Sequence, residues 1–329
     1  MFFVCKSIPE ETVIIGKTMG TTYSIRLSGV SLSENQIEEV QAKVDSVLDV
    51  INQQMSTYIP TSEISRFNKM KSKKDIKVSS GFYQVLQKSL EIYNLTDGAF
   101  DVTVHPLVKL WGFGNQRARL IPPKDDRISS LLSEIGSDKL QILGNNEIVK
   151  SEPNLEVDLS AIAKGYGVDS VVDLLQSLFY KNVMVEIGGE VRCTGENANE
   201  EQWRIGIEYP SSEHLPNQKI LDVVHFNTKA MATSGDYRNF FEFDGKRYSH
   251  TIDPKTGYPV ENNVVSVTIL SDDCITADAY ATALMVMGKE KGMKFIESLE
   301  NTECSIVELD EEDSFSIFQS SGFGKFLKK

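Results

Sequence analysis

The stretch F240-F-E-F-D-G-K-R-Y-S-H-T251 places two short, strand-like segments on either side of the pair Asp244-Gly245. An Asp-Gly pair in that position is a strong signal for a tight turn that joins two antiparallel strands. We therefore expect a β-hairpin made of residues 240–243 and 247–251. It closes a series of strand-like segments with no helical pattern between them, at 183–187, 191–193, 203–208 and 221–226. Strands grouped in this way predict an α+β fold of mostly antiparallel sheets with helices on their faces, rather than a doubly wound parallel sheet.

Helices are expected where apolar residues recur at helical spacing. Ser33 and Gln36 form a capping-box pattern just before an apolar stripe that extends from Ile37 to Met55. Similar stripes predict helices at 80–96, 162–179, 276–287 and 291–299, and a short helix that ends at Gly136. Further strands are expected at 14–27 (two short strands, or one strand bulged at Gly20), 140–143, 147–149, 155–158 and 264–270, and around Ile306 and Phe315.

Composition limits the classes of partner. The chain has 329 residues, 40% of them apolar, with a net charge of −13 and a pI near 4.9. This acidic balance argues against a nucleic-acid partner, because phosphate backbones are bound by clustered Lys and Arg. The widely spaced Cys5, Cys193, Cys274 and Cys304 describe neither a zinc site nor a disulfide framework. No long linker divides the chain, so we expect one compact unit of one or two lobes over residues 13–329, after an N-terminal segment at 1–12.

The segment T276-A-D-A-Y-A-T282 points to a metal ion. In a helix, the Asp278 carboxylate and the Thr282 hydroxyl would lie four residues apart on one face. Two such oxygen groups suit Mg²⁺, which keeps further positions for water and substrate phosphates. The alternative is structural: Asp278 complements the helix dipole, and Thr282 bonds to a carbonyl of its own helix.

Two upstream segments carry groups suited to an anionic ligand. In G98-A-F-D101 a glycine follows a helix end, where backbone can approach a ligand closely, although the segment also reads as a simple turn. In V157-D158-L-S-A161-I-A-K164-G165 a carboxylate and a hydroxyl precede a helix whose N-terminus favours anions. Asp158 is either a ligand contact or the N-cap, and Lys164, about two turns into that helix, would reach a phosphate.

His250, within S249-H-T-I-D253-P, is the histidine best placed for proton transfer, because it lies among polar groups at a strand end. The alternative is that it pairs with Asp253 and fixes the turn. His105, which precedes a proline, is expected to be structural.

These four segments, together with M19-G-T-T-Y23 and M55-S-T-Y58, occur in an order that resembles the ApbE family of FAD:protein FMN transferases, from about Gly16 to Phe326. The resemblance implies Mg²⁺-dependent transfer of FMN from FAD to a Ser or Thr side chain of an acceptor flavoprotein, with release of AMP. It also implies site residues. The flavin nucleotide would contact Met19, Tyr58 (by stacking), Ala99, Phe100, Asp101, Asp158, Lys164 and Ile252. The metal would be held by the carbonyl of Ala161 and the side chains of Asp278 and Thr282, and His250 and Asp278 would be catalytic.

One position departs from the family pattern. Members often have a second carboxylate three residues after the first, where this chain has Ala281, and this puts tight metal binding without FAD in doubt. Two alternative functions stay open: hydrolysis of FAD to FMN and AMP at the same site, and non-catalytic binding or storage of FAD.

The same resemblance implies acceptors among the subunits of respiratory redox complexes and a location in the bacterial cell envelope, on the periplasmic face of the inner membrane. No run of residues approaches the ~20 apolar residues of a membrane span. Cys5, after Phe2, Phe3 and Val4, is either the remnant of a lipid-attachment signal or an ordinary thiol. A membrane contact is therefore expected only through such an anchor, and a cytoplasmic location stays open.

Overall fold

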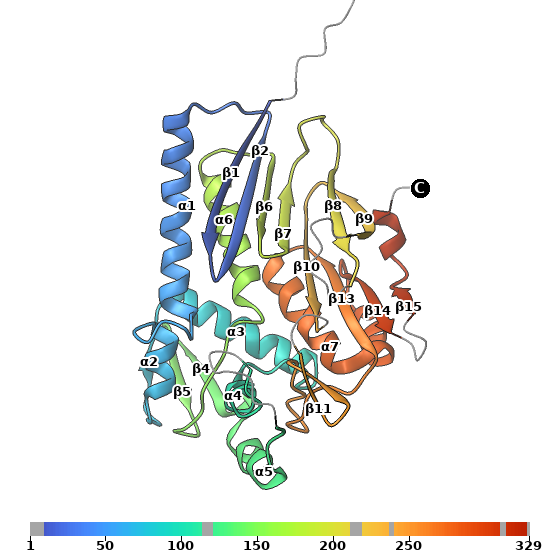
Figure 1. Ribbon diagram of the computed structural model, residues 1–329. Coiled ribbons are helices and arrows are strands. Elements are labelled where there is room, and N and C mark those ends of the chain that lie inside the picture. Colours follow the sequence, from blue (N-terminus) through green and yellow to red (C-terminus); the bar gives the residue numbers. More distant parts are fainter. Residues whose placement is uncertain (1–9, 114–120, 211–218, 237–239, 310–313, 328–329) are drawn as a thin grey trace, which may run out of the picture.

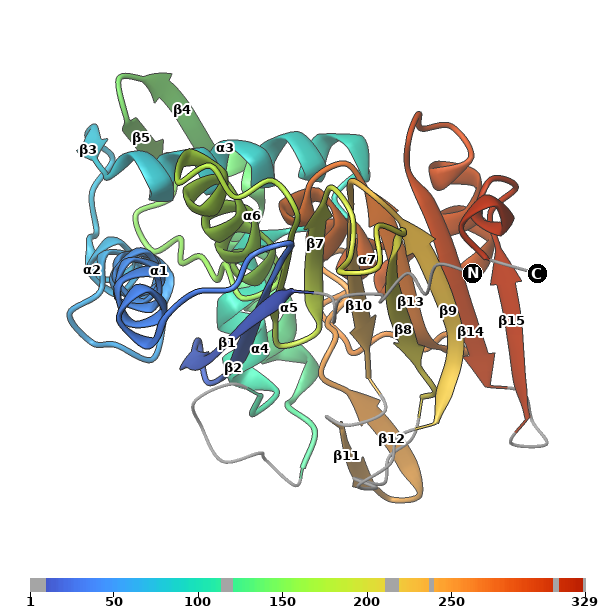
Figure 2. The same cartoon turned by 90° about the horizontal axis from the view of Figure 1, so that it is seen from above.

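The computed structural model describes residues 10–113, 121–210, 219–236, 240–309 and 314–327. Its centre is an 8-stranded sheet with the order β1-β2-β6-β7-β10-β13-β14-β15 (Figures 1 and 2). Every neighbouring pair in this sheet is antiparallel. The strands are β1 (Glu11–Thr18), β2 (Thr21–Ser28), β6 (Val183–Ile187), β7 (Glu190–Thr194), β10 (Lys229–Gly235), β13 (Val264–Ser271), β14 (Glu303–Leu309) and β15 (Phe315–Gln319). The α+β prediction is confirmed.

Three helices pack on one face of this sheet: α1 (Glu34–Met55), α6 (Ala163–Ser177) and α7 (Cys274–Ile296). The hairpin of β8 (Trp203–Glu208) and β9 (Ile220–Phe226) lies on the other face (Figure 2). Successive strand residues explain both contacts, because they point to opposite faces. In β10, Ala230 packs with α1 and α6, whereas its neighbour Met231 packs with Trp203 and Phe226.

A second region lies below the helical layer in Figure 1 and contains a 3-stranded sheet of β3 (Ile76–Lys77), β5 (Glu147–Lys150) and β4 (Leu140–Gly144). It packs with α2 (Glu63–Lys69) and α3 (Ser80–Leu95) around one apolar cluster. The hairpin of β11 (Phe240–Phe243) and β12 (Lys246–Ser249) packs with α4 (His105–Leu110) and α5 (Asp125–Glu134) around Trp111. The Asp244-Gly245 hairpin is therefore confirmed.

Several elements differ from the sequence prediction. Residues 155–158 form no strand, because the backbone N–H and carbonyl of Val157 are bonded to the Asn68 side chain; the third strand of that sheet is β3. Strand β10 (KAMATSG) was not predicted, since it contains mostly small residues and few β-branched ones. The two helices predicted at 276–287 and 291–299 form one element, α7, with a kink at Gly288 (φ 73°).

Two local predictions are confirmed. The Ser33–Gln36 capping box starts α1, and residues 14–27 form two strands joined by a turn at Met19-Gly20, both with positive φ. Among the described residues, no helix is long and apolar enough to cross a membrane.

Candidate functional site

The N-terminal ends of α6 and α7 meet at the carboxylate of Asp278. The Asp278 side chain, 3% exposed, accepts a hydrogen bond from the backbone N–H of Gly165 through Oδ2 at 2.9 Å. Glycine is required at position 165, because a Cβ there would lie 2.3 Å from the carbonyl oxygen of Cys274. The glycine therefore lets the two helix ends approach closely enough for Asp278 to bond to the other helix.

This contact also bears on the carbonyl of Ala161. In a regular α-helix the N–H of Gly165 would donate to the carbonyl four residues earlier, that of Ala161. Here α6 begins only at Ala163, and the Gly165 N–H donates to Asp278. Among the residues that the structure describes, no backbone N–H donates to the Ala161 carbonyl. The Gly165 N–H is therefore bonded to Asp278, and the Ala161 carbonyl is left without that helical partner.

Thr282 lies one turn beyond Asp278 on α7. Its Oγ1 is 3.2 Å from Oγ of Ser234 in β10. The spacing predicted from the sequence places Asp278 and Thr282 on one side of the helix, and the partner of Thr282 is a strand side chain rather than a carbonyl of α7. The alternative interpretation, in which the Thr282 hydroxyl bonds to a carbonyl of its own helix, is therefore wrong.

Two buried carboxyl groups, those of Asp278 and Glu190, lie near a single ammonium group. Lys164, in the first turn of α6, forms an ion pair with Glu190, which is 2% exposed. Burial raises the pKa of the Asp278 carboxyl, an effect that the Lys164 ammonium opposes. Burial likewise raises the pKa of Glu190, to about 8. Two buried carboxylates thus share one ammonium, and Oε2 of Glu190 has no hydrogen-bond partner within the described part of the chain.

A divalent cation fits this arrangement. It would favour the ionised form of carboxyls whose pKa burial raises. The available oxygen atoms (the Asp278 carboxylate, the Ala161 carbonyl and the Thr282 hydroxyl) are the hard ligands that Mg²⁺ prefers. Ala281, three residues after Asp278, is fully buried in the core and supplies no side-chain oxygen atom.

Met19 lies at the border of this site. It occupies the turn between β1 and β2 with φ 48°, and its Cε would be 2.9 Å from a Cβ at Gly167. Gly167 is in α6, two residues after Gly165, so the structure brings Met19 to the same helix end as Asp278.

The G98-A-F-D101 segment is held mainly by internal contacts. Oδ1 of Asp101 accepts hydrogen bonds from the N–H and hydroxyl of Thr103 and from the hydroxyl of Ser137, while Oδ2 accepts from the N–H of Ser137. Burial nevertheless raises the pKa of this carboxyl. Ala99 is 8% and Phe100 2% exposed. A ligand would therefore meet the backbone of this segment rather than its side chains.

Asp158 is not the N-cap of α6, which begins five residues later. Its Oδ1 accepts the N–H of Ser160, and its Oδ2 lies 3.0 Å from Nδ1 of His105. The expectation that Lys164 lies two turns into the helix is also wrong, because it is the second residue of α6. The sequence estimate assumed that the helix began near Asp158, whereas Leu159 and Ile162 are buried in an irregular segment before it.

His250 and Ile252 follow β12, beside the apolar cluster of α4, α5 and the β11–β12 hairpin. The ring of His250 contacts that of Phe113, with centroids 6.3 Å apart, and Ile252 is buried in the cluster around Trp111. The turn that follows is closed by Asp253, whose Oδ1 accepts the N–H of Lys255. Tyr58 lies in the connection between α1 and α2 and is 68% exposed.

Two residues near the site were not predicted. Glu190 was missed because a buried glutamate after I187-G-G is notable only when its neighbours are known. Asp169, one turn after Gly165 in α6, accepts hydrogen bonds from the N–H groups of Cys274 and Ile275 at the start of α7. Neither position has a motif that sequence reasoning alone would single out.

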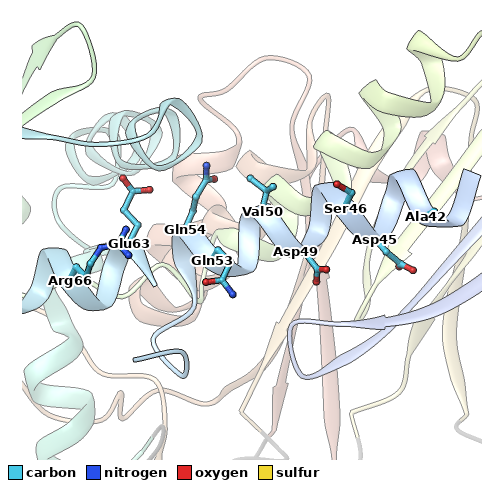
Figure 3. Close-up of a pocket in the computed structure, with 9 residues that line it drawn as sticks. All are labelled: Ala42, Asp45, Ser46, Asp49, Val50, Gln53, Gln54, Glu63 and Arg66. Atoms are coloured by element: carbon cyan, nitrogen blue, oxygen red, sulfur yellow. The ribbon is translucent and has the colours of Figure 1, made fainter. Parts of the chain in front are cut away.

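A surface hollow of about 570 Å³ lies elsewhere, along α1 and α2 (Figure 3). Asp45, Asp49, Glu63 and Arg66 are among the residues that line it, and no predicted site residue is among them. This hollow therefore adds nothing to the site at the ends of α6 and α7.

The comparisons with known proteins agree with one another. Residues 19–306 match the ApbE family. The chain is 45% identical to an FAD:protein FMN transferase of Vibrio cholerae, over 99% of this chain and 95% of that protein. It is 38% identical to an FAD:protein FMN transferase of Haemophilus influenzae, over 97% of this chain and 93% of that protein.

The fold is likewise similar to solved structures. The flavin transferase ApbE from Vibrio cholerae superposes with a TM-score of 0.85 at 44% identity, covering 97% of this chain and 99% of that one. The apo form of the flavinyl transferase ApbE from Pseudomonas stutzeri gives a TM-score of 0.85 at 33% identity, covering 97% of both chains.

Proposed function

This chain belongs to the ApbE family, and from that premise we propose that it is an FAD:protein FMN transferase that requires Mg²⁺ and modifies a Ser or Thr side chain of an acceptor flavoprotein. The observation that carries the metal part of the proposal is the buried Asp278 carboxylate at the start of α6, one helical turn from the Thr282 hydroxyl. The hydrogen bond from the Gly165 N–H fixes this carboxylate in a buried place where burial raises the pKa of two carboxyl groups, which a cation would oppose. When bound there, Mg²⁺ would neutralise charge that develops on the phosphates.

In the proposed reaction, the acceptor hydroxyl oxygen forms a bond to the phosphorus on the riboflavin side of the FAD pyrophosphate. The bond from that phosphorus to the bridging oxygen breaks, and AMP leaves with the electron pair. His250 takes the proton of the hydroxyl. Lys164 binds a phosphate oxygen, the side chain of Met19 and the ring of Tyr58 contact the flavin, and Asp158 and Ile252 complete the nucleotide site with the backbone of residues 99–101.

The decisive experiment is incubation of the protein with FAD, Mg²⁺ and a candidate acceptor, followed by in-gel flavin fluorescence and intact mass. The proposal predicts that the acceptor gains the mass of one FMN less water and that AMP appears in equal amount. Free FMN and AMP with an unmodified acceptor would show a hydrolase instead. FAD that stays bound and intact would show a binding protein.

By the family resemblance, we propose further that the acceptors are subunits of respiratory redox complexes and that the protein acts in the cell envelope. Cys5, the proposed lipid-attachment remnant, lies outside the described residues. Cell fractionation, with detection of fluorescent acceptor bands in the membrane fraction, tests both statements.

A further inference from the structure

Glu190 is a buried carboxyl group at the site, 2% exposed, to which the proposed reaction gives no role. It is the first residue of β7 and pairs across the β6–β7 hairpin with Ile187. Because residues that pair across strands share a face, and Ile187 packs with α1 and α6, the Glu190 side chain points toward α6. There one carboxylate oxygen, Oε1, forms the ion pair with Nζ of Lys164.

The hairpin turn fixes this position. Gly188 (φ 61°) and Gly189 (φ 107°) form a two-residue turn in which both φ angles are positive, a geometry that glycine adopts without strain. A Cβ at Gly188 would lie 2.8 Å from Cγ2 of Thr21, so the turn is also packed against the start of β2. Glu190 therefore sits on a rigid support, whereas Lys164 has a long and flexible side chain.

The pairing has an electrostatic reason. Burial alone would lower the pKa of Lys164, but the carboxylates of Glu190 and Asp278 outweigh that effect and raise it. Lys164 thus keeps its positive charge in a place where an isolated ammonium would be costly. The second carboxylate oxygen of Glu190, Oε2, has no hydrogen-bond partner among the described residues. The ion pair with Lys164 is therefore the side-chain contact through which we expect Glu190 to act.

We propose that Glu190 is a positioning residue that holds the Lys164 ammonium beside Asp278, so that the lysine presents a fixed positive charge to the phosphates of FAD. This inference rests on the proposed function, because it takes FAD to be the ligand. It assigns Glu190 no contact with the flavin and no part in proton transfer. Its effect should pass entirely through Lys164.

The test measures FAD affinity by quenching of flavin fluorescence, and the melting temperature, in Glu190→Gln, Lys164→Met and the double variant. Glu190→Gln keeps the shape and removes the charge. We expect it to weaken FAD binding by roughly tenfold or more, the size of a charge-assisted hydrogen bond, and to leave the binding of riboflavin, which has no phosphate, unchanged. In the Lys164→Met background the same change should alter FAD affinity by less than about twofold.

Glu186→Gln is the matched control. Glu186 belongs to the same hairpin, and its Oε1 accepts the N–H of Gly189 at 2.7 Å. Glutamine keeps an oxygen for that bond and removes a negative charge from the hairpin, but it leaves the ion pair of Glu190 with Lys164 in place. We expect it to leave FAD affinity unchanged. If Glu190→Gln fails to fold, Glu190→Asp, which keeps the charge, takes its place in the test. It should weaken FAD binding less than Lys164→Met does.

The outcomes are separable. If Glu190→Gln binds FAD normally, if it weakens FAD and riboflavin equally, or if its effect is as large in the Lys164→Met background, Glu190 does not act through Lys164 and the inference is wrong while the proposed function stands. If the wild-type protein does not bind FAD, the proposed function fails and this inference fails with it.

Discussion

Asp278 of α7 accepts a hydrogen bond from the N–H of Gly165 in the first turn of α6, at 2.9 Å. One turn further along α6, Asp169 makes a second contact between the two helices, because it accepts hydrogen bonds from the N–H groups of Cys274 and Ile275 in the first turn of α7. Each helix thus supplies a carboxylate that accepts N–H groups at the start of the other, where free N–H groups favour negative charge, in addition to the N-cap of α7, Asp273. The position of the proposed metal ligands depends on this pair of contacts.

Asp278 therefore has two tasks that substitutions can separate. Asp278→Asn keeps an oxygen atom that can accept the Gly165 N–H but removes the charge, so we expect a protein that melts close to the wild type and has lost most of its FMN transfer. Asp278→Ala also removes that acceptor and should cost about 1 kcal/mol of stability in addition. FMN transfer across a Mg²⁺ titration and thermal melting measure the two effects. Normal transfer by Asp278→Asn at saturating Mg²⁺ would contradict the metal assignment.

Asp169 predicts a pH dependence of stability. Burial raises the pKa of this carboxyl to about 6, although Arg192 and the capped N–H groups oppose the shift. Between about pH 4 and pH 6 the folded protein holds a proton that the unfolded chain has lost, so the contribution of Asp169 to the free energy of unfolding falls as pH rises. The difference between wild type and Asp169→Asn should therefore shift in favour of the variant by up to about 3 kcal/mol from pH 4 to pH 7.

Urea unfolding at several pH values measures that difference. Asp173→Asn is the control, because Asp173 also lies near Arg192, at 3.5 Å, but its side chain is 70% exposed. Its stability curve should run parallel to that of the wild type. A parallel curve for Asp169→Asn as well would show that Asp169 is ionised throughout this range.

Thr282 tests the proposed metal geometry. Thr282→Val keeps the β-branched shape and removes the oxygen atom, so transfer should require a higher Mg²⁺ concentration. It also removes the contact with Ser234, which costs about 1 kcal/mol. Thr282→Ser keeps the oxygen and should retain the wild-type Mg²⁺ requirement. If the valine variant has an unchanged Mg²⁺ titration, Thr282 serves only to join α7 to β10.

Tyr58 is exposed enough for a clean binding test. Because 68% of this residue is exposed, Tyr58→Ala should leave the melting temperature nearly unchanged. If the ring stacks on the flavin, the substitution should weaken FAD binding by about 1–3 kcal/mol, a magnitude taken from base stacking on aromatic side chains. Tyr58→Phe, which keeps the ring, should bind FAD almost as the wild type does. Equal dissociation constants for all three proteins would remove Tyr58 from the site.

The sequence predicted what local patterns determine. The Ser33–Gln36 capping box and the Asp244-Gly245 turn are each specified by residues within a few positions, and both are present. Strand β10 was missed because its small residues have a low propensity for strands. It forms a strand because it pairs with β7 on one side and β13 on the other.

The site shows the same limit. The segments that hold Asp278 and Lys164 were identified, but Glu190 and Asp169 act through residues more than 20 positions away, and a single sequence carries no signal for such pairs. Asp101 shows the converse, since its carboxylate is engaged by Ser137, a partner 36 residues away that the sequence does not reveal.

His250 remains the residue whose two interpretations predict opposite results. A general base typically contributes 10²- to 10⁴-fold in rate and need not affect ligand affinity. A histidine that fixes the turn after β12 should instead affect stability first. We predict that His250→Asn, which can form one of the hydrogen bonds but cannot take up the proton, binds FAD normally and transfers FMN at least ~10²-fold more slowly. The wild-type rate should fall as pH decreases through the range in which histidine becomes protonated, and the variant should lose that dependence. Transfer rates from pH 5.5 to pH 8.5, with melting temperatures at each pH, distinguish the two interpretations. A variant that keeps its rate but melts earlier would assign His250 to the turn and would place the base on another residue or on the acceptor protein.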